Sequence, residues 1–119
     1  MCGIIGIASS KPVSMNIISS LKKLEYRGYD SAGLATINKN EISEKKCSGR
    51  VEELEKILFK KPSNGNLGIG HVRWATHGIP NVINAHPHSS EIVSVVHNGI
   101  IENSDEIKTK LEKKGIKFK

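Results

Sequence analysis

The chain has 119 residues, the length of one small domain and too short for two. Its formal charge is +6, but acidic residues are interleaved with the basic ones and aromatic residues make up only 4%. Without an aromatic surface on which bases could stack, we expect no nucleic-acid binding. No apolar run approaches the roughly 18 residues that span a bilayer, and no basic residue precedes the first apolar run as in a secretory signal. We therefore expect a cytoplasmic protein without a membrane segment.

The first thirty residues predict a strand followed by a helix. The short apolar run from Cys2 to Ala8 predicts a buried strand. Between Pro12 and Glu25, apolar residues recur at steps of three and four, which is the spacing of one helix face. Gly28 is a typical helix breaker, so the helix should end there.

The middle of the chain predicts a hairpin and a second helix. Two strand-like segments, 34–38 and 42–48, flank the turn-like tripeptide Asn38-Lys39-Asn40. Helical spacing returns over residues 51–59, and Pro62 follows as a breaker.

The second half predicts strands at 67–72 and 92–97, separated by a long irregular segment at 74–90 that is typical of a functional loop. Asn103 then predicts the side-chain cap of a last helix, which Gly115 ends. Hairpin-connected strands with helices between them favour an α+β layered domain.

The two cysteines, Cys2 and Cys47, predict different environments. The number of cysteines alone would allow a disulfide between them, but a reducing cytosol disfavours one. Cys47 fits a packed strand position. Once Met1 is removed, the thiol and the α-amine of Cys2 belong to one residue. That amine has a reference pKa of about 7.7–8.0, so a useful fraction is neutral and can act as a general base. Taken alone, a cysteine at this position is more often incidental.

Three further groups could carry chemistry. Asn98-Gly99 could supply an amide and a backbone N–H to an oxyanion hole, although in isolation the dipeptide favours a simple turn. Arg73 could hold a carboxylate through two parallel hydrogen bonds, or form a surface ion pair beside a packed Trp74. His86 and His88 form at most a weak pair of metal ligands without an acidic or cysteine partner, so we expect no metal.

Five segments, in this order, resemble the class II glutamine amidotransferases. They are Met1–Ile4, Glu25–Gly33 (EYRGYDSAG), Arg73–Gly78 (RWATHG), Asn84–His88 (NAHPH) and His97–Asn103 (HNGIIEN). The resemblance covers essentially the whole chain, and the second segment points to the branch that aminates a sugar phosphate. It implies an α+β fold of the N-terminal nucleophile hydrolase type, an αββα sandwich, of which residues 1–119 form the front half of a glutaminase domain.

The resemblance also implies roles for individual residues. Cys2 would be the nucleophile that attacks the side-chain amide of L-glutamine, and Asn98 and Gly99 would stabilise the oxyanion. The residues that would bind glutamine are Arg73, Trp74, Thr76, His77 and His86. Arg27 would stand behind them and hold the pocket in shape. No cofactor and no metal is implied.

Several parts of such a protein lie outside these 119 residues. They are an aspartate for the α-amino group of glutamine, the rest of the glutaminase domain, and two sugar-isomerase domains that bind fructose 6-phosphate. One sheet face and its strand edges should therefore be uncovered. We expect a glutaminase part that feeds ammonia to fructose 6-phosphate to make glucosamine 6-phosphate. The alternatives are an inactive truncated remnant, one piece of a split enzyme, and a basic interaction module that uses the lysine-rich end.

Overall fold

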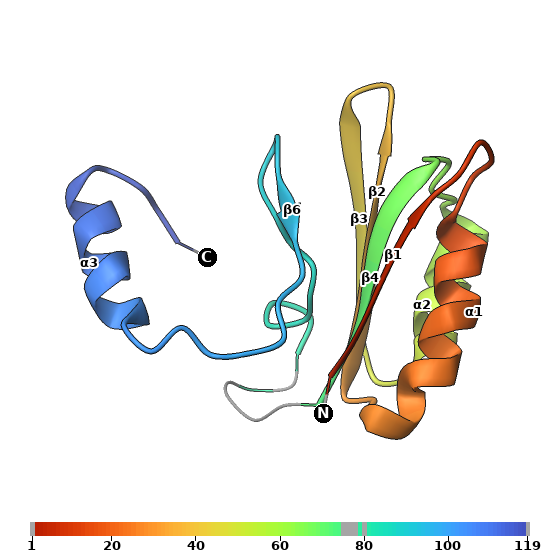
Figure 1. The fold of residues 1–119 in the computed structure, drawn as a ribbon, viewed down its shortest axis with the longest axis horizontal. Coiled ribbons are helices and arrows are strands. Elements are labelled where there is room, and N and C mark those ends of the chain that lie inside the picture. Colours follow the sequence, from red (N-terminus) through yellow and green to blue (C-terminus); the bar gives the residue numbers. More distant parts are fainter. Residues whose placement is uncertain (1, 75–78, 80, 119) are drawn as a thin grey trace.

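The computed structural model describes residues 2–74, 79 and 81–118, and its main body is an antiparallel sheet with two helices on one face (Figure 1). The strand order is β1-β4-β2-β3. The strands are β1 (Gly3–Ala8), β2 (Ser31–Asn38), β3 (Glu41–Ser48) and β4 (Leu67–Arg73). The helices are α1 (Ser14–Leu24), which runs into the 3₁₀ turn η1 (Glu25–Arg27), and α2 (Val51–Lys60). The α+β class predicted from the sequence is confirmed.

The core lies between the sheet and these two helices, and β4 shows how the packing is achieved. A Cβ atom on Gly68 or Gly70 would lie 2.7 or 2.5 Å from the Ile17 side chain of α1. The two glycines thus let the helix pack closely on the sheet. Because side chains alternate along a strand, the larger residues of β4, which include His71 and Arg73, lie on the opposite face.

The predicted hairpin is confirmed, with a longer first strand than the sequence indicated. β2 and β3 pair from Ser31↔Ser48 to Asn38↔Glu41. The two loop residues, Lys39 and Asn40, have φ values of 49° and 64°. A two-residue loop with positive φ at both positions matches the right-handed twist of the strands that it joins.

The prediction that β1 is a buried strand was wrong. Its partner is β4, on one side only, so β1 is an edge strand of the sheet. Ile5 and Ile7 pack against the core, whereas Ile4 points to the other face and is 42% exposed. The apolar run is continuous, but within the described residues only one face of this strand is covered.

The segment 81–118 lies on the side of the sheet away from α1 and α2 (Figure 1). It forms a small hairpin of β5 (His88–Ser89) and β6 (Ser94–Val95), followed by α3 (Ser104–Lys113). β5 falls in the segment predicted to be irregular, and β6 is shorter than the predicted strand. The helix α3 stands apart from the sheet, and none of its residues is buried.

The ends of α3 confirm one prediction and correct another. Gly115 has φ +89°, and the Ile116 N–H donates to the Leu111 carbonyl oxygen at 3.1 Å, which is a glycine-terminated helix end. Asn103 occupies the N-cap position, but its side chain makes no capping hydrogen bond. Its φ of −100° and ψ of 31° differ from the extended backbone that directs a cap over the first turn.

The uncovered sheet face expected from the sequence is present only in part, because His71 and Arg73 on this face are buried while three apolar side chains are not. Ile4, Ile37 and Leu67 are 42%, 41% and 48% exposed. In the part of the chain that the structure describes, no helix is both long and apolar enough to span a bilayer.

Candidate active site

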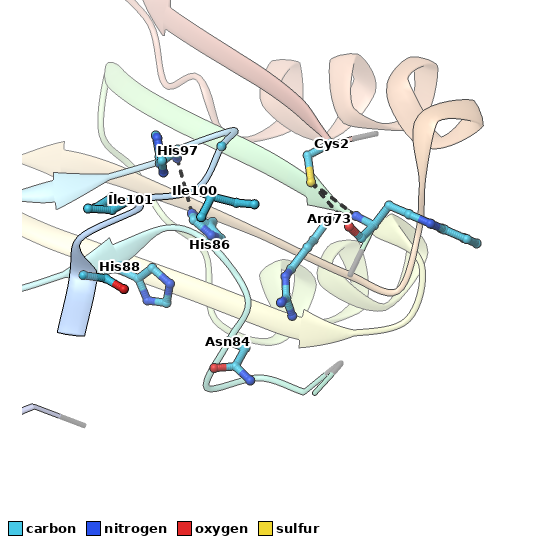
Figure 2. Close-up of a pocket in the computed structure, with 11 residues that line it drawn as sticks. Cys2, Arg73, Asn84, His86, His88, His97, Ile100 and Ile101 are labelled. Atoms are coloured by element: carbon cyan, nitrogen blue, oxygen red, sulfur yellow. Dashed lines mark hydrogen bonds between the residues drawn. The ribbon is translucent and has the colours of Figure 1, made fainter. Parts of the chain in front are cut away.

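A cavity of about 550 Å³ lies where the start of β1, the end of β4 and the segment 84–101 meet (Figure 2). Antiparallel pairing of Gly3 with Val72 brings the two strand ends together, so Cys2 and Arg73 become neighbours. The polar side chains in its lining are Cys2, Arg73, Asn84, His86, His88, His97 and Ser104.

The thiol of Cys2 is held against the backbone of Trp74. The Trp74 N–H donates to Sγ at 3.4 Å, and Sγ lies 3.7 Å from the Trp74 carbonyl oxygen. A Cβ atom on Gly28 would overlap the Trp74 side chain. The glycine after η1 therefore allows the chain to pack closely behind the residue that contacts the thiol.

The side-chain amide of Asn98 lies next to Cys2, although its own segment is exposed and has no regular structure. Its Nδ2 donates to the Cys2 carbonyl oxygen at 3.2 Å, and its Oδ1 lies 2.8 Å from Nε2 of His71. Gly99, but not Asn98, is among the described residues that line the cavity, and it has φ +156°. A Cβ atom there would lie 3.1 Å from Nε2 of His97.

Three histidine rings are in contact at this site. The His71 ring stacks on the His86 ring at 4.4 Å with an interplanar angle of 22°, and the His88 ring lies 4.5 Å from His86, tilted by 58°. Burial, with a smaller contribution from the two neighbouring rings, lowers the pKa of His86 to about 3. Burial also lowers the pKa of His71, against the opposing effect of the bond to Asn98. Both rings are therefore neutral at physiological pH.

The segment that carries His86 is fixed to the sheet by contacts with β2 and β3. The Lys46 ammonium group donates to the Ala85 carbonyl oxygen at 2.9 Å. A Cβ atom on Gly33 would overlap the His86 carbonyl oxygen, so the absence of a side chain there sets how closely the segment approaches. The His97 N–H donates to Nδ1 of His86 at 3.3 Å and joins the segment to the residues before Asn98.

The other predicted site residues are placed as follows. Arg73 ends β4, and its guanidinium donates to the Ile79 carbonyl oxygen at 3.4 Å. Arg27 is half-buried in η1 and is not among the described residues that line the cavity. Thr76 and His77 lie outside the described residues.

Sequence reasoning missed roles for Asn84 and His71. Nδ2 of Asn84 donates to the Ile79 carbonyl oxygen at 2.9 Å, the same oxygen that accepts from the Arg73 guanidinium. The alternation along β4 is the signal that could have found His71, because it puts this residue on the same face as Arg73.

The structure also answers the questions of a disulfide and of a metal site. Cys2 and Cys47 are both free thiols, so the disulfide left open by counting is not formed. Cys47 packs in the core, and burial raises its pKa to about 11, which keeps the thiol protonated. Within residues 2–74, 79 and 81–118, no group of three or more His, Cys, Asp or Glu side chains is placed to hold a metal ion.

No family model matches the chain. Among curated proteins, it is 54% identical over 118 residues to glutamine–fructose-6-phosphate aminotransferase (isomerizing) of Bradyrhizobium diazoefficiens, covering 99% of this chain and 19% of that protein. The same-named protein of Clostridium acetobutylicum is 54% identical over 121 residues, covering 100% of this chain and 20% of the relative. The chain therefore spans about a fifth of the length of these relatives.

Solved structures show the same fold. The glutamine phosphoribosylpyrophosphate amidotransferase from B. subtilis matches with a TM-score of 0.81 and 25% identity, over 100% of this chain and 26% of that one. A structure described as the allosteric regulatory enzyme of purine biosynthesis matches with a TM-score of 0.82 and 26% identity over the same shares. In sequence and in fold, the chain resembles the N-terminal part of the class II glutamine amidotransferases.

Proposed function

We propose that this chain forms the catalytic side of a glutaminase, in which Cys2 is the nucleophile once Met1 has been removed. The observation that supports this most strongly is the pair of contacts around Cys2. The Trp74 N–H donates to its Sγ at 3.4 Å, and the Asn98 amide donates to its carbonyl oxygen at 3.2 Å. A nucleophile thus stands beside an amide donor, as acyl transfer requires.

The first half of the reaction forms a thioester. The α-amine of Cys2, directly or through a water molecule, takes the thiol proton, and Sγ attacks the side-chain amide carbon of glutamine. The carbonyl oxygen becomes an oxyanion that accepts hydrogen bonds from Asn98 and from the backbone N–H of Gly99. When the tetrahedral adduct collapses, the C–N bond breaks, the nitrogen takes the proton from the α-ammonium group and ammonia leaves.

The second half releases glutamate. The α-amine now takes a proton from water, and the resulting hydroxide attacks the γ-glutamyl thioester carbon. The same N–H donors hold the second oxyanion. The C–S bond then breaks, the thiol is restored, and the sum of the two halves is glutamine plus water giving glutamate plus ammonia.

Glutamine is held by groups around the cavity. The Arg73 guanidinium binds the α-carboxylate. Because the neighbouring His86 is neutral, the positive charge that attracts this carboxylate comes from Arg73. By the resemblance, Trp74 would belong to a segment that closes over glutamine and limits the loss of ammonia, and Thr76 and His77, which lie outside the described residues, would line the same pocket. Arg27 supports the pocket from η1.

The whole protein would use the ammonia on a sugar phosphate. Residues 1–119 are the front half of a glutaminase domain, and the curated relatives are named for amination of fructose 6-phosphate. The remaining glutaminase residues and the sugar-isomerase domains, in the same or another chain, would complete glucosamine 6-phosphate synthesis in the cytoplasm. The alternative, a remnant or split-enzyme piece without turnover of its own, is favoured by the uncovered sheet face.

Glutamate release from L-glutamine tests the proposal and separates it from the alternative. The chain without Met1 is assayed alone and mixed with the complementary glutaminase segment of a relative. We expect release in the mixture that Cys2→Ser abolishes. Glutamate release by the chain alone would contradict the alternative that the chain is a remnant without turnover. Release that persists in Cys2→Ser would contradict the assignment of the nucleophile.

A further inference from the structure

We propose that His71 is a positioning residue of this site: its Nε2–H holds the Asn98 amide so that one N–H of that amide faces the oxyanion position beside Cys2. The inference rests on the proposed glutaminase function for its catalytic consequence. The positioning itself follows from contacts between β4, Cys2 and the segment after β6.

The Cys2 carbonyl oxygen decides which way the Asn98 amide points. This oxygen can only accept a hydrogen bond, and the amide group lies 3.2 Å from it. A reversed amide would bring two oxygens together, so the NH₂ group must face Cys2 and Oδ1 must face His71, 2.8 Å away. Because Oδ1 is also an acceptor only, Nε2 of His71 must carry hydrogen.

The environment of His71 indicates that this hydrogen bond is the reason for a histidine here. The side chain is fully buried in β4 and stacks on the His86 ring. Its Nδ1 is buried without a hydrogen-bond partner among the described residues. A buried polar atom left unpaired lowers the stability of the fold, a cost that an apolar side chain of similar size would avoid. The bond to Asn98 is the polar contact that offsets this cost.

Asn98 needs such an anchor because its backbone does not provide one. Residues 96–99 have no regular structure, and Asn98 is exposed. The NH₂ group has two hydrogens, of which one is used on the Cys2 carbonyl oxygen. With Oδ1 fixed by His71, the second hydrogen is left in a defined direction for an oxyanion. Without His71, the amide has one anchor and can rotate.

Nuclear magnetic resonance of the chain tests the positioning without any need for turnover. Long-range ¹H–¹⁵N correlation of the histidine rings should show His71 as the Nε2–H tautomer. In His71→Phe, the Asn98 side-chain NH₂ should exchange with solvent faster than in the unaltered chain. His71→Gln, whose amide nitrogen can donate from a similar position, should restore slow exchange. An Nδ1–H tautomer, or an Asn98 signal that is the same in all three chains, would overturn the proposal.

The catalytic consequence is measured in the complemented glutaminase. Removal of one oxyanion donor costs about 100- to 1000-fold in kcat, so releasing it from one anchor in His71→Phe should cost less, about 10- to 100-fold, with little change in KM. His71→Gln should recover most of this loss, and His71→Phe should add little in an Asn98→Ala background. Full additivity of the two changes would contradict positioning through Asn98. Hydrolysis that survives in Cys2→Ala would instead contradict the proposed function and leave the tautomer result standing.

Discussion

At the scale of single residues, the site depends on close approach between segments that are distant in sequence. Asn98 reaches Cys2 across 96 positions, and the His86 segment approaches the sheet over Gly33, which has no Cβ to block it. The geometry around the thiol is therefore sensitive to single methyl groups placed far from the thiol.

Gly33→Ala should displace the His86 segment. The added methyl group would overlap the His86 carbonyl oxygen, and forced repacking of this kind costs about 1–3 kcal/mol. The free energy of unfolding, measured with urea, should fall by that amount. Gly6→Ala is the matched control on the same sheet, because its nearest described atoms are 4.0 Å from the new Cβ. Equal stabilities of the two variants would contradict the close approach at Gly33.

Acidification should destabilise the chain partly through His86. Its pKa is about 3 in the folded chain and about 6.5 when unfolded, so between these pH values only the unfolded state takes up the proton. The contribution of neutral His86 is fully present above pH 6.5 and is lost progressively as the pH falls towards 3. His86→Asn should therefore show a smaller drop in unfolding free energy between pH 7 and pH 4 by urea titration. Identical slopes would show that His86 is accessible to protons in the folded chain.

At the scale of elements, local patterns predicted α1, α2 and the β2–β3 hairpin because helical spacing and turn residues are properties of a short stretch of sequence. The exposed face of β1 and the missing cap at Asn103 could not be predicted in this way, since both depend on what packs nearby. The site residues divide in the same way, into those predicted from sequence patterns and those that depend on packing. Motif resemblance predicted Cys2 and Asn98 as site residues, whereas the proposal for His71 required its contacts with Asn98 and His86 in the structure.

The helices should differ sharply in their contribution to stability. Leu54 of α2 is fully buried, whereas Ile107 of α3 is 39% exposed on a helix without buried residues. Leu54→Ala should cost about 2–5 kcal/mol, and Ile107→Ala should stay within about 0.5 kcal/mol. Chemical denaturation measures both. A cost for Ile107→Ala as large as that for Leu54→Ala would show that α3 packs against a surface in solution.

At the scale of the whole molecule, the chain combines a packed layer of sheet and helices with an open apolar face. Leu67 and Ile37 lie near one another on this face and are half-exposed. An exposed apolar surface is typical of an interaction site, and under the proposed function it would pack against the rest of the glutaminase domain.

The open face should bind the hydrophobic dye ANS. Leu67→Lys should reduce the dye fluorescence with little loss of stability, because the side chain is already 48% exposed. The complementary glutaminase segment should lower the fluorescence of the unaltered chain and fail to do so with Leu67→Lys. Dye binding that is insensitive to both changes would place the exposed apolar surface elsewhere, for example on α3.

The most direct test of the catalytic assignment is covalent labelling of the chain without Met1, complemented by the rest of the glutaminase domain. A diazoketone analogue of glutamine is added, and the modified residue is located by peptide mass spectrometry. We expect one adduct, on Cys2, formed more slowly when L-glutamine is present and absent in Cys2→Ala. Cys47 serves as the internal control, because its buried thiol has a pKa of about 11 and should remain unmodified. Labelling of Cys47 in preference to Cys2, or labelling of Cys2 that glutamine does not slow, would contradict the assignment of Cys2 as the glutaminase nucleophile.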